Sequence, residues 1–258
     1  MAGAYASGVL ASPCPAIYLD LGTNGELLLT TGTDNGGHLY AASCAVGPCF
    51  EGAGIGSGVG GIPGAISRVS MQNGEWIFST VGDEKPIGIT GSGLIDLIAC
   101  LLGNGTVARD GRLDQPFHLT GRQVFSDGTL SESVATPVTI DQSDVRAVQT
   151  AKSAVRAGIA ALLSEAWIDP DEIGCVLLAG SFGLYLSPSS AAAIGLMPKA
   201  WAADARAVGN AALDGAEAAL LSAKAREGIV SIANASHVVD LNSSGAFRDA
   251  FLSGLNFQ

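Results

Sequence analysis

Two short apolar segments joined by a glycine-containing turn lie near the start of the sequence. Residues 17–20 are predicted to form a buried strand that ends on Asp20, and residues 26–31 a second strand that returns beside it. Asn24 and Gly25 stand between them, and an Asn-Gly pair between two apolar runs is the strongest short-range signal for a β-hairpin. The chain is therefore expected to build a sheet around an antiparallel strand pair.

Downstream segments alternate between strand and helix patterns. A long helix is expected after Asp141 or Ser143, either of which can cap it, because apolar residues then recur on one face. Residues 173–179 are predicted to form a buried strand. The other expected elements are strands over 38–45, 87–90 and 238–241, a hairpin over 68–83, and helices over 94–102, 210–226 and 246–255. Hairpins followed by alternating strands and helices indicate a mixed α/β fold.

Two stretches fall outside this pattern. Residues 1–16 are expected to be a leader or linker, and they lack the basic start and the continuous apolar run of a signal peptide. Residues 104–137 are polar and turn-rich, which predicts an insertion or a boundary. The longest uncharged run, 173–198, is interrupted by glycine, serine and proline, so a lipid-facing helix is not expected there. The expected location of the protein is the cytoplasm.

The sequence is acidic, with 24 acidic and 13 basic residues and a net charge of -11. An acidic surface repels phosphate backbones, so nucleic acids and anionic membranes are poor partners. The 5 cysteines include no C-x-x-C pair and the 3 histidines have no i, i+4 spacing. Neither an iron–sulfur cluster nor a histidine-bound metal is therefore expected in this chain. An anionic ligand would have to be held by backbone N–H groups, a helix N-terminus or a bridging metal ion.

The hairpin turn has the composition of a phosphate-binding turn. Gly22 and Gly25 allow a close approach of the backbone, and Thr23 and Asn24 add side-chain donors. Asp20, at the end of its strand, is placed to hold Mg²⁺ through water, since Mg²⁺ prefers carboxylates together with retained waters. An ordinary structural hairpin is the alternative, and spacing alone does not separate the two.

A second candidate turn follows the predicted strand over 173–179. The end of such a strand is where open α/β sheets bind ligands. Taken alone, a structural turn with an aromatic core residue explains this segment better. The candidate ligand-binding residues of this turn are Gly180, Ser181, Phe182 and Gly183.

Two more glycine-rich segments are weaker candidates. Gly91 and Ser92 precede a helix and can cap an anion, although such a turn more often only starts a helix. Residues 51–64 contain a G-x-G-x-x-G match, but Pro63 stands where the following helix should begin. A mobile or tightly folded loop is expected instead, with Glu51 as its one charged group.

Taken in order, a series of segments resembles the C-terminal domain of the ATP-dependent reductive activators of corrinoid proteins. These activators belong to the superfamily of actin, sugar kinases and chaperone ATPases. The matching segments lie at residues 19–26, 47–52, 89–96, 142–152, 179–183, 194–198 and 208–212. The resemblance covers nearly the full chain. It implies an actin-like (ribonuclease-H-like) ATPase lobe over residues 17–258, with a mixed sheet flanked by helices.

The resemblance also implies a function. Such activators pass an electron from an N-terminal 2Fe–2S domain to an inactive Co(II) corrinoid, and ATP hydrolysis drives the reduction to Co(I). It makes the turn at 20–24 a phosphate-binding turn and the turn at 180–183 the adenosine-side turn, with ATP and Mg²⁺ as cofactors. Asp20 and Glu51 are the candidate catalytic residues, and Asp20 is the candidate metal ligand. A corrinoid protein and a second copy of the chain are the expected partners.

The chain departs from the family in two respects. The ferredoxin cysteines of the family and its earlier Asp-x-Gly-Thr turn are absent here. Because phosphoryl transfer depends on positioning between two lobes, the chain alone is expected to be inactive or weakly active. Two other functions stay open. One is a docking or dimerisation module for a corrinoid protein, and the other is a small-molecule kinase of the same superfamily, with Glu51 and Asp96 as candidate bases.

Overall fold

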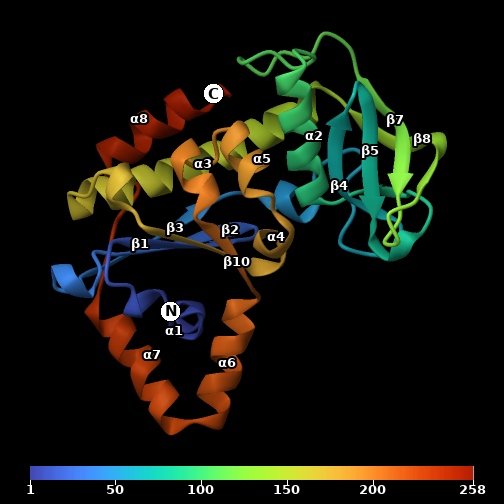
Figure 1. Ribbon diagram of the computed structural model, residues 1–258. Helices are drawn as coiled ribbons and strands as arrows, with labels where there is room; N and C mark the ends of the chain where they lie inside the picture. Colours follow the sequence, from blue (N-terminus) through green and yellow to red (C-terminus); the bar gives the residue numbers. More distant parts are fainter. Residues whose placement is uncertain (258) are drawn as a thin grey trace.

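The strands of the computed structural model form two sheets, and helices cover both faces of the larger one (Figure 1). The structure describes residues 1–257, apart from the side chains of Ser181 and Leu184. The larger sheet has the order β10-β9-β1-β2-β3-β11. Its strands are β1 (Ala16–Leu21), β2 (Asn24–Thr30), β3 (Leu39–Ala45), β9 (Cys175–Ala179), β10 (Ala205–Gly209) and β11 (Ser236–Val238). The predicted mixed α/β architecture is confirmed.

The larger sheet is built outward from the β1–β2 hairpin. Strands β1, β2 and β3 are antiparallel neighbours, as the two apolar runs and their turn predict. Strand β9 then joins β1 in parallel, with Asp20 opposite Ala179, and β10 joins β9 in parallel. The carboxyl ends of β1, β9 and β10 therefore lie at one edge of the sheet.

Alternation along β1 sends its side chains to two different cores. Leu19 and Leu21 belong to the main apolar core, together with buried residues of α3 such as Val155. Tyr18 points to the opposite face and packs in a smaller core with Ala4. Helices α3 (Gln142–Ala166), α5 (Pro188–Ala193) and α8 (Gly245–Gly254) lie on the first side, and α1 (Ala2–Ser7), α6 (Ala211–Leu221) and α7 (Ala223–Ala235) on the second (Figure 1).

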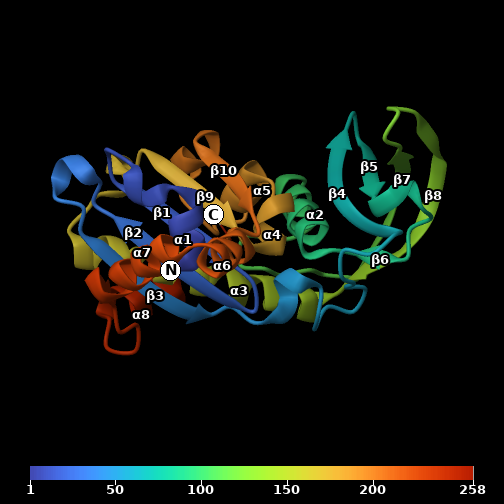
Figure 2. The same ribbon diagram turned by 90° about the horizontal axis from the view of Figure 1, so that it is seen from below.

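The second sheet, of order β6-β4-β5-β7-β8, lies beside the first, and helix α2 stands between them in both views (Figures 1 and 2). Its hairpin β4–β5 turns at Asn73 and Gly74, both with positive φ, as the Asn-Gly signal predicts. The remaining elements are β4 (Ala65–Gln72), β5 (Glu75–Thr80), β6 (Gly88–Ile89), β7 (Phe117–Val124), β8 (Leu130–Ile140), α2 (Gly91–Gly103) and α4 (Gly180–Tyr185).

Both stretches that had no predicted elements are ordered parts of the fold. Residues 1–16 contain α1, and Ala4 and Val9 are buried against the larger sheet, so this segment is packed structure rather than a free linker. Residues 104–137 contain β7 and most of β8, and β7 pairs in parallel with β5. The pairing joins residues distant in sequence, which local patterning does not reveal.

Two predicted boundaries are wrong. The helix expected over 210–226 is two helices, because the hydroxyl of Ser222 accepts the N–H of Ala225 and starts α7. The last strand lies at Ser236–Val238, before the expected 238–241, where it pairs in parallel with β3.

Candidate functional site

The two glycine turns singled out in the sequence meet at the carboxyl edge of the larger sheet. Gly180 follows β9 directly, and its φ of +88° is left-handed. A Cβ atom there would lie 2.7 Å from the Leu21 carbonyl oxygen and 2.9 Å from Asp20 Oδ1. Only glycine fits this contact, since an L side chain is both strained and obstructed. The segment expected as a turn is in fact the first turn of α4.

The turn of the β1–β2 hairpin is shifted from its predicted position. Leu21 pairs with Gly25, so Asn24 and Gly25 belong to β2, and Gly22 and Thr23 form the turn. The Gly22 N–H donates to the Asn24 carbonyl over 3.0 Å, so that group is engaged within the hairpin. Asn24 is exposed at the start of β2.

Gly25 has a packing role. A Cβ atom at this position would lie 3.0 Å from both Cys44 Sγ and Val46 Cγ2, which belong to the main core. The absence of a side chain is thus explained by close packing of β2 against its neighbour rather than by an approaching phosphate.

Glu51 lies over the hairpin turn. It ends the short 3₁₀ helix Pro48–Glu51, and the Thr23 hydroxyl donates to its Oε2 atom. Glu51 Oε1 is 3.6 Å from the position that a Cβ atom on Gly22 would take. The structure thereby brings the candidate catalytic carboxylate to the candidate phosphate turn, although the two are far apart in sequence.

A cavity of about 590 Å³ opens beside Glu51. Its apolar wall includes Phe50 and Phe182, whose rings stack with centroids 4.5 Å apart and planes within 6°. Gly91 also lines it, and a Cβ atom there would lie 1.9 Å from the Phe50 carbonyl oxygen. Phe182 is thus both a core residue and a wall of the cavity. The cavity lies between the N-terminus of α2, helix α4, strand β4 and the loop at residues 59–61.

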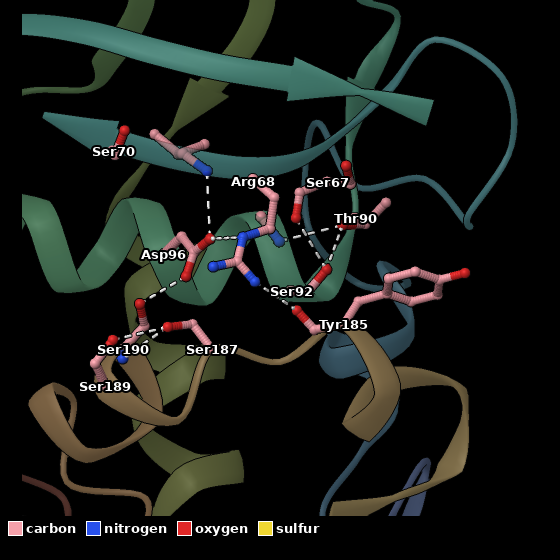
Figure 3. Close-up of polar contacts among 12 residues, drawn as sticks. Ser67, Arg68, Ser70, Thr90, Ser92, Asp96, Tyr185, Ser187, Ser189 and Ser190 are labelled. Carbon is pink, nitrogen blue, oxygen red and sulfur yellow. Dashed lines mark hydrogen bonds and ion pairs between the residues drawn. The ribbon is translucent and has the colours of Figure 1, made fainter. Parts of the chain in front are cut away.

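The N-terminus of α2 forms the polar wall of this cavity (Figure 3). The Thr90 side chain caps the helix by accepting the Gly93 N–H over 3.1 Å. The Ser92 hydroxyl lies 2.9 Å from Thr90 Oγ1 and donates to the Ser67 carbonyl over 3.2 Å. The Ser92 side chain is therefore held in a hydrogen-bonded network at the edge of the cavity.

Asp96 is engaged in structure and is not available as a base. Its Oδ1 accepts the Ser190 hydroxyl at 2.6 Å, and its Oδ2 accepts the Val69 N–H at 3.3 Å and lies 3.2 Å from Arg68 Nε (Figure 3). Arg68 in turn donates to the Tyr185 carbonyl. Burial raises the pKa of Asp96, and its donors partly offset that rise. Asp96 is therefore set aside as the candidate base of a small-molecule kinase.

Asp20 lies at the edge of the sheet, next to Tyr18, Gly180 and Glu26. Its Oδ2 accepts the Tyr18 hydroxyl at 2.9 Å, and its Oδ1 faces Gly180. Glu26 is directly opposite on β2, and burial followed by the charge of Asp20 raises the pKa of Glu26. Tyr18 was not among the predicted site residues, although a spacing of two on a strand places it on the same face as Asp20.

The donor set suits a cation that arrives with phosphate rather than a resident metal. Within residues 1–257, no three acidic, histidine or cysteine side chains gather closely enough to hold an ion by themselves. Mg²⁺ commonly uses one or two carboxylates and completes its shell with water and phosphate oxygens. Asp20, half-buried beside the two turns, fits that pattern.

The fold, with two glycine-containing segments that meet at one sheet edge, defines an actin-like domain. The chain belongs to the family described as the C-terminal domain of RACo, the ASKHA domain, whose model matches residues 15–258. A solved structure, the reductive activator for corrinoid, iron-sulfur protein, superposes with a TM-score of 0.84 at 32% identity over 99% of this chain and 42% of its own. The predicted fold and family resemblance are confirmed.

Two curated relatives carry related names. The corrinoid activation enzyme RamQ of Eubacterium limosum is 36% identical over 220 residues, which is 80% of this chain and 36% of the relative. The Co(II) methylated amine-specific corrinoid protein reductase of Methanosarcina barkeri is 26% identical over 273 residues, 96% of this chain and 47% of the relative. The chain spans less than half the length of each.

The helices give no sign of a membrane span. Among the described residues, none is both long enough and apolar enough to cross a bilayer.

Proposed function

We propose that this chain is the nucleotide-binding lobe of an ATP-dependent reductive activator that returns Co(II) corrinoid proteins to Co(I). Family membership and the names of the related proteins support the proposal. The observation that carries it is the meeting of Asp20, near the end of β1, and Gly180, at the start of α4, at one edge of the sheet. In a mixed sheet of this kind the carboxyl edge is where ligands bind.

The proposed site assigns a role to each group at this edge. Asp20 would hold Mg²⁺ through water, and Thr23 and the backbone around it would face the phosphates. Glu51, whose carboxylate already accepts the Thr23 hydroxyl, would orient the attacking water. The adenosine side would lie along Gly180 and the cavity walled by Phe182. When bound, ATP supplies the free energy for the reduction.

The remaining parts of the proposal concern partners. The electron would come from a 2Fe–2S group outside this chain, and the electron acceptor would be a corrinoid protein in the cytoplasm. We also propose a homodimer, which exposed leucines on one helix face support: Leu213 is 54% exposed and Leu220 79%. We propose residues 17–258 as the ATPase-type domain.

Calorimetric titration with Mg-ATP tests the site. Wild type is expected to bind weakly, with Asp20→Asn at least about tenfold weaker, since a metal-linked carboxylate is lost. The matched control is Asp34→Asn, an exposed aspartate in the loop after β2. Equal affinity in wild type and Asp20→Asn would remove Asp20 from the site.

A second titration distinguishes the activator proposal from the docking alternative. If the chain serves only as a docking module, a Co(II) corrinoid protein will bind it with the same affinity whether or not Mg-ATP is present. The activator proposal expects nucleotide to change that affinity, because linkage between two ligands is reciprocal.

A further inference from the structure

Tyr18 lies on β1 two residues before Asp20, so both side chains project from the same face of the sheet. Only 4% of Tyr18 is exposed. Its hydroxyl donates to Asp20 Oδ2 over 2.9 Å. Because Oδ1 faces Gly180, the two oxygens of this carboxylate have separate neighbours.

Helix α1 closes over the Tyr18 hydroxyl. A Cβ atom on Gly3 would lie 2.2 Å from Tyr18 Oη and 3.2 Å from the backbone nitrogen of Ala212, so glycine is required where α1 crosses the sheet beside α6. The two views agree that α1 lies under the larger sheet, next to α6 (Figures 1 and 2). The family match begins at residue 15, so α1 precedes it.

The phenol is kept as a hydrogen-bond donor. Burial, followed by the charge of Asp20, raises the pKa of Tyr18 well above its usual value, and Glu26 adds to the rise. Tyr18 therefore stays protonated through the physiological range. A hydrogen bond from a neutral donor to a carboxylate is stronger than one between neutral groups.

We propose that Tyr18 is a positioning residue for Asp20, and that helix α1 holds it in place. The hydroxyl fixes Oδ2 and leaves Oδ1 turned toward Gly180, where the two turns meet. The role in ligand binding rests on the proposed Mg-nucleotide site. The contacts that join α1, Tyr18 and Asp20 are present when no nucleotide is bound.

The first experiment compares Mg-ATP affinity in Tyr18→Phe and Tyr40→Phe. The first variant removes only the hydroxyl on Asp20 and is expected to bind about tenfold more weakly, the size of a hydrogen bond to a charged group. Tyr40 lies on β3 against His237 and away from Asp20, so its variant should match wild type. Both variants are compared by urea unfolding, so that a loss of fold is not mistaken for a loss of positioning.

The second experiment needs no nucleotide. The ¹³C resonance of the Asp20 carboxyl group is recorded by NMR at one fixed pH. In Tyr18→Phe it should move from its wild-type position, because the hydrogen bond to Oδ2 is lost. Gly3→Leu, which forces α1 off the Tyr18 hydroxyl, should move it in the same direction, whereas Tyr40→Phe should leave it in place. An Asp20 resonance unchanged in Tyr18→Phe would show that the hydroxyl does not hold Asp20.

The outcomes distinguish the proposed nucleotide site from the proposed positioning role of Tyr18. If Asp20→Asn leaves Mg-ATP affinity unchanged, the proposed nucleotide site fails, whatever Tyr18 does. If Asp20→Asn weakens binding and Tyr18→Phe does not, the positioning role alone is overturned. An Asp20 carboxyl resonance that is unchanged in Gly3→Leu would overturn the link through α1.

Discussion

At the scale of single residues, glycines mark where backbones meet. Gly180 has a left-handed backbone conformation. The Leu21 carbonyl oxygen and Asp20 Oδ1 lie close to the position that a Cβ atom would take. Gly25 instead relieves crowding inside the core. Both stand in glycine-rich motifs, and the sequence alone does not tell these roles apart, because the neighbours that decide them come from other strands.

Gly180→Ala should destabilise the protein more than Gly37→Ala. Both positions have positive φ, which costs an L residue roughly 1–2 kcal/mol. Gly37 has nothing within 4 Å of the added Cβ, whereas Gly180 meets the Leu21 carbonyl. The free energy of unfolding in urea is the measurement. Equal losses in the two variants would mean that the contact with Leu21 is not tight.

At the scale of elements, the C-terminal segment is fastened to α3 by buried polar groups. Lys152 is fully buried and donates from Nζ to the Asn256 carbonyl over 2.5 Å, and Gln149 donates to the Leu255 carbonyl over 2.6 Å. The Lys152 ammonium also lies 5.1 Å from the centre of the Phe257 ring.

The predicted cap of α3 is confirmed, since Asp141 accepts the N–H of Asp144.

Lys152 should make stability depend on pH. Burial, with a smaller effect of Arg156, lowers its pKa to about 8 in the folded protein from 10.5. Between these values the unfolded chain binds more protons, so the free energy of unfolding should rise with pH from about 8 to 10.5. Lys152→Met should lack this rise. Urea unfolding at several pH values measures it, and parallel curves for the two proteins would contradict the account.

Local patterns predicted the elements whose signals lie within a few residues. The β1–β2 hairpin, β9 and α3 follow from apolar periodicity and capping residues. The break at Ser222 was missed because an alanine-rich run favours one continuous helix. The β5–β7 pairing and the stack of Phe50 on Phe182 were also missed, since they join distant segments. The residues of the candidate site, apart from Tyr18, were proposed from the sequence, but their meeting in space was not derivable from spacing.

At the scale of the whole molecule, the two sheets are joined through α2 and a buried carboxylate. Asp96 on α2 receives donors from β4 and from α5, and it is only 3% exposed. This junction borders the cavity, because Arg68 also holds the carbonyl of Tyr185, which lines it. Asp96 therefore adds buried hydrogen bonds to the apolar packing that holds the second sheet beside the proposed site.

Asp96→Ala should destabilise the protein by roughly 1–3 kcal/mol for each buried donor left unpaired. The Val69 N–H and the Ser190 hydroxyl are those donors. The control is Asp114→Ala, which breaks an exposed ion pair with Arg112 and should cost less than about 1 kcal/mol. Urea unfolding measures both. A similar small loss in each would show that Asp96 does not join the sheets.

The central claim is that the carboxyl edge of the larger sheet binds Mg-nucleotide. Backbone amide chemical shifts of the ¹⁵N-labelled chain, recorded with Mg-ATP up to about 10 mM, test it most directly, because weak binding is still visible at that concentration. The largest changes are expected around Gly22, Glu51 and Gly180, and they should shrink in Asp20→Asn. Changes confined to other surfaces, or no change at this edge, would contradict the claim.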